Sequence, residues 1–110
     1  MSDTLQVLGQ LQPASGAQVD LCYAALGESI VISTLFCANQ SSSCGHFTVS
    51  IAPKGVTDAT SQIIYAVTEI FGNSTFPITC GIVLGSTDVL RVKSDNGQIS
   101  FTACGTRVAP

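Results

Sequence analysis

Hydrophobic and polar residues alternate one by one in several short stretches of this chain. The clearest stretch places Phe47, Val49 and Ile51 at every second position, with polar residues between them. A period of two is that of a β-strand with one buried face, because successive side chains of a strand point to opposite sides. Helical periodicity is missing over any useful length, and strand and turn formers such as Val, Ile, Thr, Ser and Gly dominate. The pattern predicts an all-β protein.

Residues typical of turns separate these stretches. Ser41–Gly45 forms one such break, and Asp95-Asn96-Gly97 gives the strongest hairpin signal, because Asn-Gly accommodates the positive φ of a type I′ turn. About eight short strands predict a single antiparallel β-sandwich, jelly-roll-like in its arrangement. The expected strands span residues 5–11, 18–24, 29–38, 45–52, 62–69, 75–83, 88–93 and 98–104.

Two segments depart from simple alternation. Ser29–Cys37 is apolar on both faces, so it is either a central strand covered on both sides or a strand whose second side meets a partner subunit. The first fourteen residues are rich in glutamine and end near Pro13, which favours an arm or edge strand that docks on a neighbour. We therefore expect an N-terminal attachment segment (1–14) followed by a β-sandwich domain (15–110). The residues expected to attach it are Leu5, Val7, Leu8, Gln10 and Leu11.

Charged side chains are scarce, at 10% of residues against roughly 25% in an ordinary soluble domain. Residues 29–53 contain no Asp, Glu, Lys or Arg at all. Surface charge keeps proteins apart in solution, so a small domain with so little of it is expected to be covered by other protein. The composition therefore predicts a subunit of an assembly.

The same composition argues against other partners. The net charge is −3 with four basic residues, which is a poor basis for binding nucleic acid or an anionic membrane. No apolar run approaches the 18 or more residues typical of a membrane span, and the N-terminus lacks the features of a signal peptide. We expect synthesis and assembly in a cytoplasm.

Five cysteines allow two interpretations. They could be free thiols that act as small hydrophobic residues, as is usual in cytosolic proteins, or they could form disulfides within the subunit or to a neighbour. Cys37 and Cys44 bracket a strand connection and could face each other, and an odd number leaves one thiol for an intermolecular bond. The candidates for a disulfide or cross-link are Cys22, Cys37, Cys44, Cys80 and Cys104.

Catalytic and metal-binding patterns are weak. Cys44 and His46 are the one conceivable pair of nucleophile and base, but about 6–7 Å separates alternate positions on one face of a strand. No acidic residue in the same segment orients His46, the only histidine. The cysteines lack zinc-ligand spacing. We therefore expect no catalytic residue, no metal and no cofactor.

Several segments together resemble a family. These segments, spread over nearly the whole chain, are Val7–Gln10 with Pro13, Val31–Asn39, Phe47–Gly55, Ile64-Tyr65, Leu84–Val92 and Ile99–Phe101. Their sequences resemble small virion structural proteins of tailed bacteriophages, including cyanophages. The resemblance implies a trimeric β-sandwich on the exterior of the virion, as an appendage or a decoration, with no catalytic residues. This chain has more cysteines than the resemblance leads one to expect.

We therefore expect a homotrimeric tail or neck appendage, anchored by its N-terminal arm and locked by thiols. Its partners would be copies of itself and other virion proteins of the tail, the neck or baseplate, or the major capsid protein. The first alternative is a capsid decoration (cement) protein at three-fold positions of the head. The second is a receptor- or glycan-binding tip module that uses loops near Tyr65, Phe71 or Asn73.

Overall fold

The computed structural model describes residues 4–55 and 62–108. These residues form eight β-strands and one short 3₁₀ turn, η1 (Pro53–Gly55). Among them, no helix is long and apolar enough to cross a membrane. The strands are β1 (Thr4–Leu11), β2 (Val19–Tyr23), β3 (Ser29–Asn39), β4 (Gly45–Ala52), β5 (Ile63–Ile70), β6 (Ser74–Leu84), β7 (Val89–Ser94) and β8 (Ile99–Val108).

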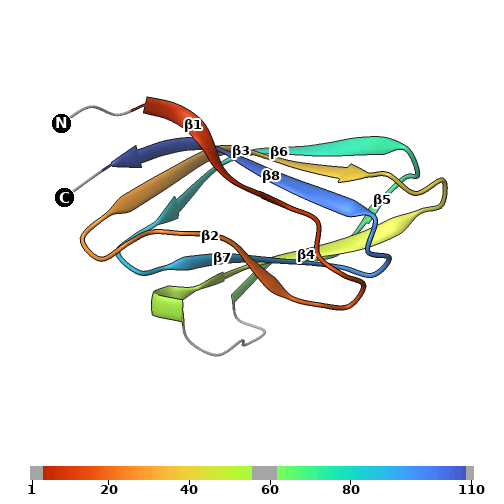
Figure 1. Cartoon of the computed structure of the whole chain (residues 1–110), viewed down its shortest axis with the longest axis horizontal. Coiled ribbons are helices and arrows are strands. Elements are labelled where there is room, and N and C mark those ends of the chain that lie inside the picture. Colours follow the sequence, from red (N-terminus) through yellow and green to blue (C-terminus); the bar gives the residue numbers. More distant parts are fainter. Residues whose placement is uncertain (1–3, 56–61, 109–110) are drawn as a thin grey trace.

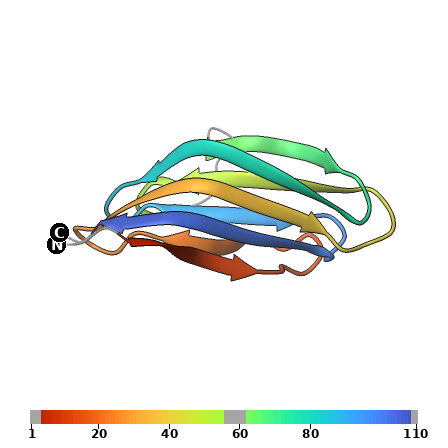
Figure 2. The ribbon, with the colours of Figure 1, turned by 90° about the horizontal axis from the view of Figure 1, so that it is seen from above.

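The strands form two four-stranded antiparallel sheets that pack face to face (Figure 1). Sheet A has the order β1-β8-β3-β6, and sheet B has the order β2-β7-β4-β5. Figure 2 looks onto sheet A from above and shows its four strands lying side by side. The expected all-β antiparallel sandwich is confirmed.

The pairing is that of a jelly roll. Strand β1 pairs with β8, β2 with β7, β3 with β6 and β4 with β5, so the chain resembles one long antiparallel ribbon wound around a core. The pairs β3–β8 and β4–β7 then join neighbouring turns of the ribbon into the two sheets. Consecutive strands therefore usually lie in opposite sheets, and β4–β5 is the pair of consecutive strands bonded to each other.

This winding corrects the expected hairpin at Asp95-Asn96-Gly97. The turn connects β7 of sheet B to β8 of sheet A, so it crosses between sheets and joins strands that do not pair. Of Asn96 and Gly97, Gly97 alone has a positive φ, of 68°, whereas a type I′ turn needs positive φ at both central residues. The Asn-Gly signal correctly marks a reversal of the chain but misidentifies the turn type and the strands' relationship.

The last strand extends four residues beyond its expected end at residue 104. Gly105 continues the strand because its missing side chain allows a close approach: a Cβ there would lie 2.0 Å from the carbonyl oxygen of Val31. A register irregularity between Ile32 and Thr34 lies beside this contact. The glycine thus permits a close approach of the paired strands β3 and β8 at this point.

Both sheets contribute to one core. Phe47 of sheet B contacts two rings of sheet A edge to face, with centroid separations of 5.6 Å to Phe76 and 6.1 Å to Phe101. Strand β3 is a central strand of sheet A, and one of its two faces packs on the core. Its inner residues, such as Ile32 and Leu35, are completely buried.

Residues 4–11 of the expected attachment segment form the edge strand β1 of sheet A. Residue 14 lies in the connection between β1 and β2. Thr4 pairs with Arg107, so the first and last described parts of the chain lie at one end of the sandwich (Figure 1). The β3–β4, β5–β6 and β7–β8 connections lie at the opposite end.

Candidate interaction surfaces

The outer face of sheet A carries no charged side chain among the described residues. Its side chains lie in rows that cross all four strands, for example Gln10, Thr102, Phe36 and Pro77. The alternation of buried and accessible positions assigns these residues to the outside of the sheet. The outward-facing residues are Val7, Gln10, Val31, Thr34, Phe36, Ala38, Thr75, Pro77, Thr79, Gly81, Val83, Ser100, Thr102, Cys104 and Thr106.

Large apolar side chains on this face reach solvent. Phe36 is 40% exposed in the middle of the sheet, and Val83 is 61% exposed on the edge strand β6. Val7 and Val31 add two more. The one charged residue in the four strands, Arg107, lies at the end of the sandwich, where it pairs with Glu28. The second side of β3 is thus an uncharged surface that stays partly exposed within the described part of the chain.

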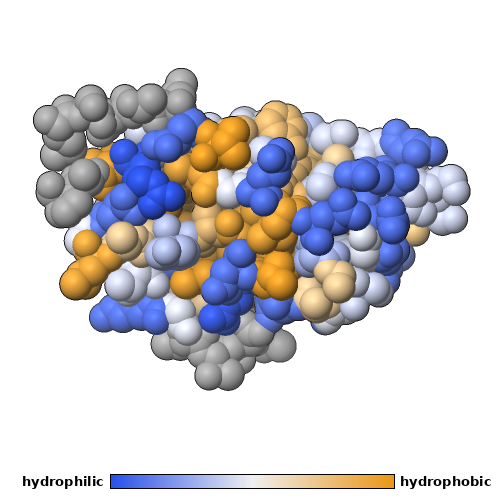
Figure 3. Space-filling model, in the orientation of Figure 1, coloured by the Kyte–Doolittle hydropathy of each residue, from blue (hydrophilic) through white to orange (hydrophobic). Residues whose placement is uncertain are grey.

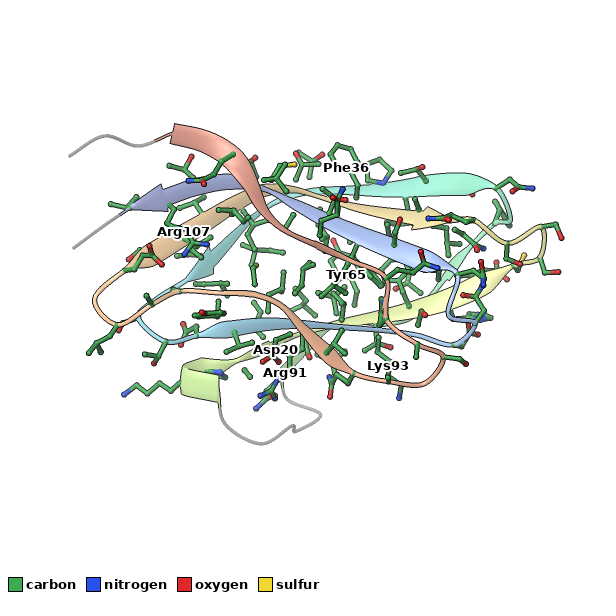
Figure 4. All side chains as sticks on the ribbon, in the orientation of Figure 1. Asp20, Phe36, Tyr65, Arg91, Lys93 and Arg107 are labelled. Atoms are coloured by element: carbon green, nitrogen blue, oxygen red, sulfur yellow. The ribbon has the colours of Figure 1, made fainter. Side chains whose placement is uncertain are left out.

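The outer face of sheet B differs in chemistry. Asp20 and Arg91 lie opposite each other on β2 and β7 and form an ion pair of 3.0 Å. Lys93 and Glu69 add further charges on the strands of this sheet. Figure 4 shows Asp20, Arg91 and Lys93 on the sheet B side, Phe36 on the opposite side of the molecule and Tyr65 between the two sheets.

His46 has a carboxylate partner that its own segment does not contain. Nδ1 of His46 lies 2.9 Å from Oδ2 of Asp95, which comes from the β7–β8 turn, and the backbone N–H of His46 donates to Oδ1. That backbone hydrogen bond is the main cause that lowers the pKa of Asp95. The segment of His46 indeed holds no acid, and the orienting carboxylate comes from a turn 49 residues away. No hydrogen bond joins the imidazole to the thiol of Cys44, so a nucleophile–base pair is not assembled.

The described cysteines are free thiols in two environments. Cys37 is fully buried and Cys44 is exposed, so the facing pair that their spacing suggested does not form. Burial raises the pKa of Cys22 to about 11 and that of Cys37 to about 12, which makes both thiols poor nucleophiles. Cys104 lies on the outer face of sheet A. The side chain of Cys80 lies outside the described part.

Of the residues expected to attach the chain to a neighbour, some pack in the chain's own core and others face outward. Leu8 is buried and Leu11 packs against the chain's own core, so neither is free while β1 stays in its sheet. Val7 and Gln10 face outward, and Gln10 donates to the hydroxyl of Thr102. The side chain of Leu5 lies outside the described part.

The described surface includes hollows at two places of interest. One, of about 330 Å³, is lined by Leu8, Cys22, Tyr23, Glu28 and Arg107. It lies on the side bounded by β1 and β2, where Figure 3 shows hydrophobic residues between the two strands. The other, of about 190 Å³, adjoins the His46–Asp95 pair. Within the described residues, no group of three or more His, Cys, Asp or Glu side chains is arranged to hold a metal ion.

Asn39 organises the end of the molecule far from Thr4 and Val108. It is 2% exposed, and its amide nitrogen lies 3.2 Å from the carbonyl oxygen of Ile70. Its side-chain oxygen accepts from the backbone N–H of Ser41 and from the amide of Asn96. One buried side chain thus holds three connections together. Sequence reasoning missed this role, and the only signal was a polar residue at an inward position of an apolar strand.

Of the three residues expected to mark a receptor-binding tip, two lie at this same end of the molecule. Phe71 is 69% exposed, and Asn73 is also exposed and donates its backbone N–H to Ser41. Tyr65, in contrast, packs against the core between the sheets. The structure therefore brings Phe71 and Asn73 together beside the β3–β4 loop and places Tyr65 elsewhere.

Comparisons with known proteins extend the description of the fold. No protein-family model matches the sequence, and no curated protein matches it either. Among solved structures, a chain of the T13 viral particle of infectious bursal disease virus is similar, with a TM-score of 0.55 and 13% identity over 96% of this chain. The VP2 subviral particle of the same virus gives a TM-score of 0.51 and 12% identity over 96% of this chain.

At such identities the likeness shows the fold alone. This chain spans about a third of the length of those viral chains, 30% and 32% respectively. The shared fold is the wound two-sheet sandwich described above, so this chain has a fold that occurs in virus particles.

Proposed function

We propose that this chain is a structural subunit of a virion, and specifically a homotrimeric tail or neck appendage of a tailed bacteriophage. The observation that carries the proposal is the uncharged outer face of sheet A, with Phe36 and Val83 partly in water. A monomeric soluble protein rarely exposes a contiguous apolar patch larger than a few hundred Å². The viral-particle fold and the sequence resemblance support the choice of a virion as the setting.

Residues 1–14 are the proposed attachment segment. Strand β1 forms one edge of sheet A, and its outward edge is free to meet another virion protein. Its start lies at the same end as the last described residues, so attachment there would point the Asn39 end of the molecule away from the particle. This polarity suits an appendage on the virion exterior, built after synthesis in the host cytoplasm.

The test is to locate the chain in purified particles. A cryo-electron map should show it in threefold groups at the tail or neck, and mass spectrometry should find a few dozen copies or fewer per particle. Particles that contain no copy of the chain would contradict a structural role. A thiol lock predicts a cross-linked band on non-reducing gels, through Cys44 or Cys104, that reducing agent removes; a band of monomer size under both conditions would remove the lock.

A capsid decoration (cement) protein is the second candidate, favoured by the same uncharged face, which would suit burial against a shell surface. Copy number separates the two, because hundreds of copies per particle at three-fold positions of the head would indicate cement. A receptor- or glycan-binding tip is the third, favoured by exposed Phe71 beside Asn73. Binding of the isolated protein to host cells, lost in Phe71→Ala, would support it.

A further inference from the structure

We infer that three copies of this chain pack the outer faces of their A sheets around a common three-fold axis and so build a second, shared core. The inference rests on the proposed trimer and names the surface that forms it. The face meets the first requirement of self-association, since it carries no charge that two copies would oppose to each other. Phe36, Val31 and Val83 supply apolar area that packing would remove from water.

The polar groups of the face are already partly satisfied within one copy. The hydroxyl of Thr102 accepts from Gln10, and the hydroxyl of Ser100 accepts from Gln40. Beside the face, at the register irregularity of β3, the hydroxyl of the exposed Ser33 donates to the carbonyl of Cys104. Burying a polar group is costly mainly when its hydrogen bonds are lost. These local bonds lower the cost of burying the hydroxyls of Ser100 and Thr102.

The edges of sheet A are less suitable for joining copies. Pro77 lies in the edge strand β6 and has no N–H to donate to an added strand. The opposite edge, β1, has a register irregularity between Val7 and Gly9. Proline and bulges are devices that discourage strand pairing at sheet edges. Copies are therefore expected to meet through the face rather than by continuing the sheet from β6 to the next β1.

The dimensions of the face fit a three-fold arrangement. Four strands at about 4.8 Å spacing make a sheet about 19 Å wide. Three such sheets around an axis form a triangular prism whose sides lie about 19/(2√3), or roughly 5.5 Å, from the axis. That distance is close to half of the ~10 Å that separates packed sheets, so side chains of ordinary size fill the space.

The residues nearest the axis have suitable sizes. The axis would pass over the junction of β8 and β3, the two central strands of sheet A. On β8 the outward side chains are small, namely Ser100, Thr102, Cys104 and Thr106. Strand lengths of 8 to 11 residues give each face roughly 600 Å², near the ~800 Å² per partner of a standard interface.

The experiment measures molar mass by light scattering during size-exclusion chromatography. The wild-type chain should elute at about 34 kDa, three times 11.3 kDa. Thr102→Glu would bury three carboxylates near the axis and should raise the dissociation constant at least about 100-fold, giving monomers. Thr48→Glu is the matched control, because Thr48 lies on the outer side of the central strand β4 of sheet B. Circular dichroism checks that each variant is folded.

Val83→Glu repeats the test at a more exposed position and covers the case in which Thr102→Glu fails to fold. Trimers that persist in both face variants would overturn the inference and leave the proposed trimer in place, formed through another surface. A wild-type mass of one or two chains would overturn the three-fold arrangement. The location of the chain in purified particles tests the virion role independently of this mass measurement.

Discussion

The inner faces of sheets A and B pack together in one core, yet the outer faces of the two sheets differ in chemistry. The strands of sheet B carry Asp20, Glu69, Arg91 and Lys93, and the first and third of these form an ion pair. The strands of sheet A carry only Arg107, which is held at the end of the sandwich by Glu28. The demands of folding are the same for both sheets, because each needs one apolar face.

We infer that the difference reflects what each outer face meets. A face that contacts water is kept soluble by charge, as in sheet B. A face that contacts protein needs complementary shape and few charges, and the lack of charge on sheet A fits the proposed contact. Each of the following predictions tests whether this division between the two sheets is real.

The largest losses of folding stability should come from substitutions on the inner faces, and they should be equal in the two sheets. Phe101→Ala in sheet A and Phe47→Ala in sheet B should each lower the free energy of unfolding by about 3–5 kcal/mol, because each removes a fully buried ring. Urea unfolding at one protein concentration measures both. If either ring can be removed at a cost below about 1 kcal/mol, that sheet does not share the common core.

The next effect should distinguish two accessible thiols. In the assembled protein, with Cys80→Ser as the background, Cys44 in its exposed loop should react with a maleimide at least about 10-fold faster than Cys104 on the sheet A face. Cys22 and Cys37 should stay unreactive because they are buried. Thr102→Glu should release Cys104, and denaturant should equalise all thiols. Equal rates for Cys44 and Cys104 in the native protein would mean that the face is open to water.

The sequence predicted the positions of the strands well, because alternation is a local signal that survives in any packing. It did not predict which strands pair. The Asp95-Asn96-Gly97 turn shows why: the local signal marks a chain reversal, but the choice of sheet depends on partners far along the chain. Gly105 shows the same limit, since its role depends on the carbonyl of Val31.

The sequence predicted that the chain has an uncharged surface, but it did not predict which strands form the outer face of sheet A. The lack of charge in residues 29–53 indicated a covered surface, yet the outward residues of β8 and β6 join it only through the sheet order. Asn39 and the His46–Asp95 pair were missed for a similar reason. Their partners lie in distant connections, which no spacing in the sequence brings together.

A smaller effect should appear in acid. The backbone N–H of Ala25, helped by Arg107, lowers the pKa of Glu28, and the backbone N–H of His46 lowers that of Asp95. A carboxylate with a lowered folded pKa stabilises the fold above its unfolded pKa, and this contribution is lost as the pH falls through the folded pKa. Stability should therefore decline below about pH 4.3. Glu28→Gln and Asp95→Asn should each flatten the decline in urea titrations from pH 7 to pH 3, and an unchanged slope in both would contradict these assignments.

The smallest effect should come from the charged face itself. Arg91→Gln removes the ion pair with Asp20, whose side chain is 59% exposed, and should change the free energy of unfolding by at most about 1 kcal/mol, less at high salt. The mass of the assembly should not change, because this face is expected to contact water. If Arg91→Gln dissociated the assembly while Thr102→Glu left it intact, the roles of the two sheets would be reversed, and the charges of sheet B would have to be read as contacts between subunits.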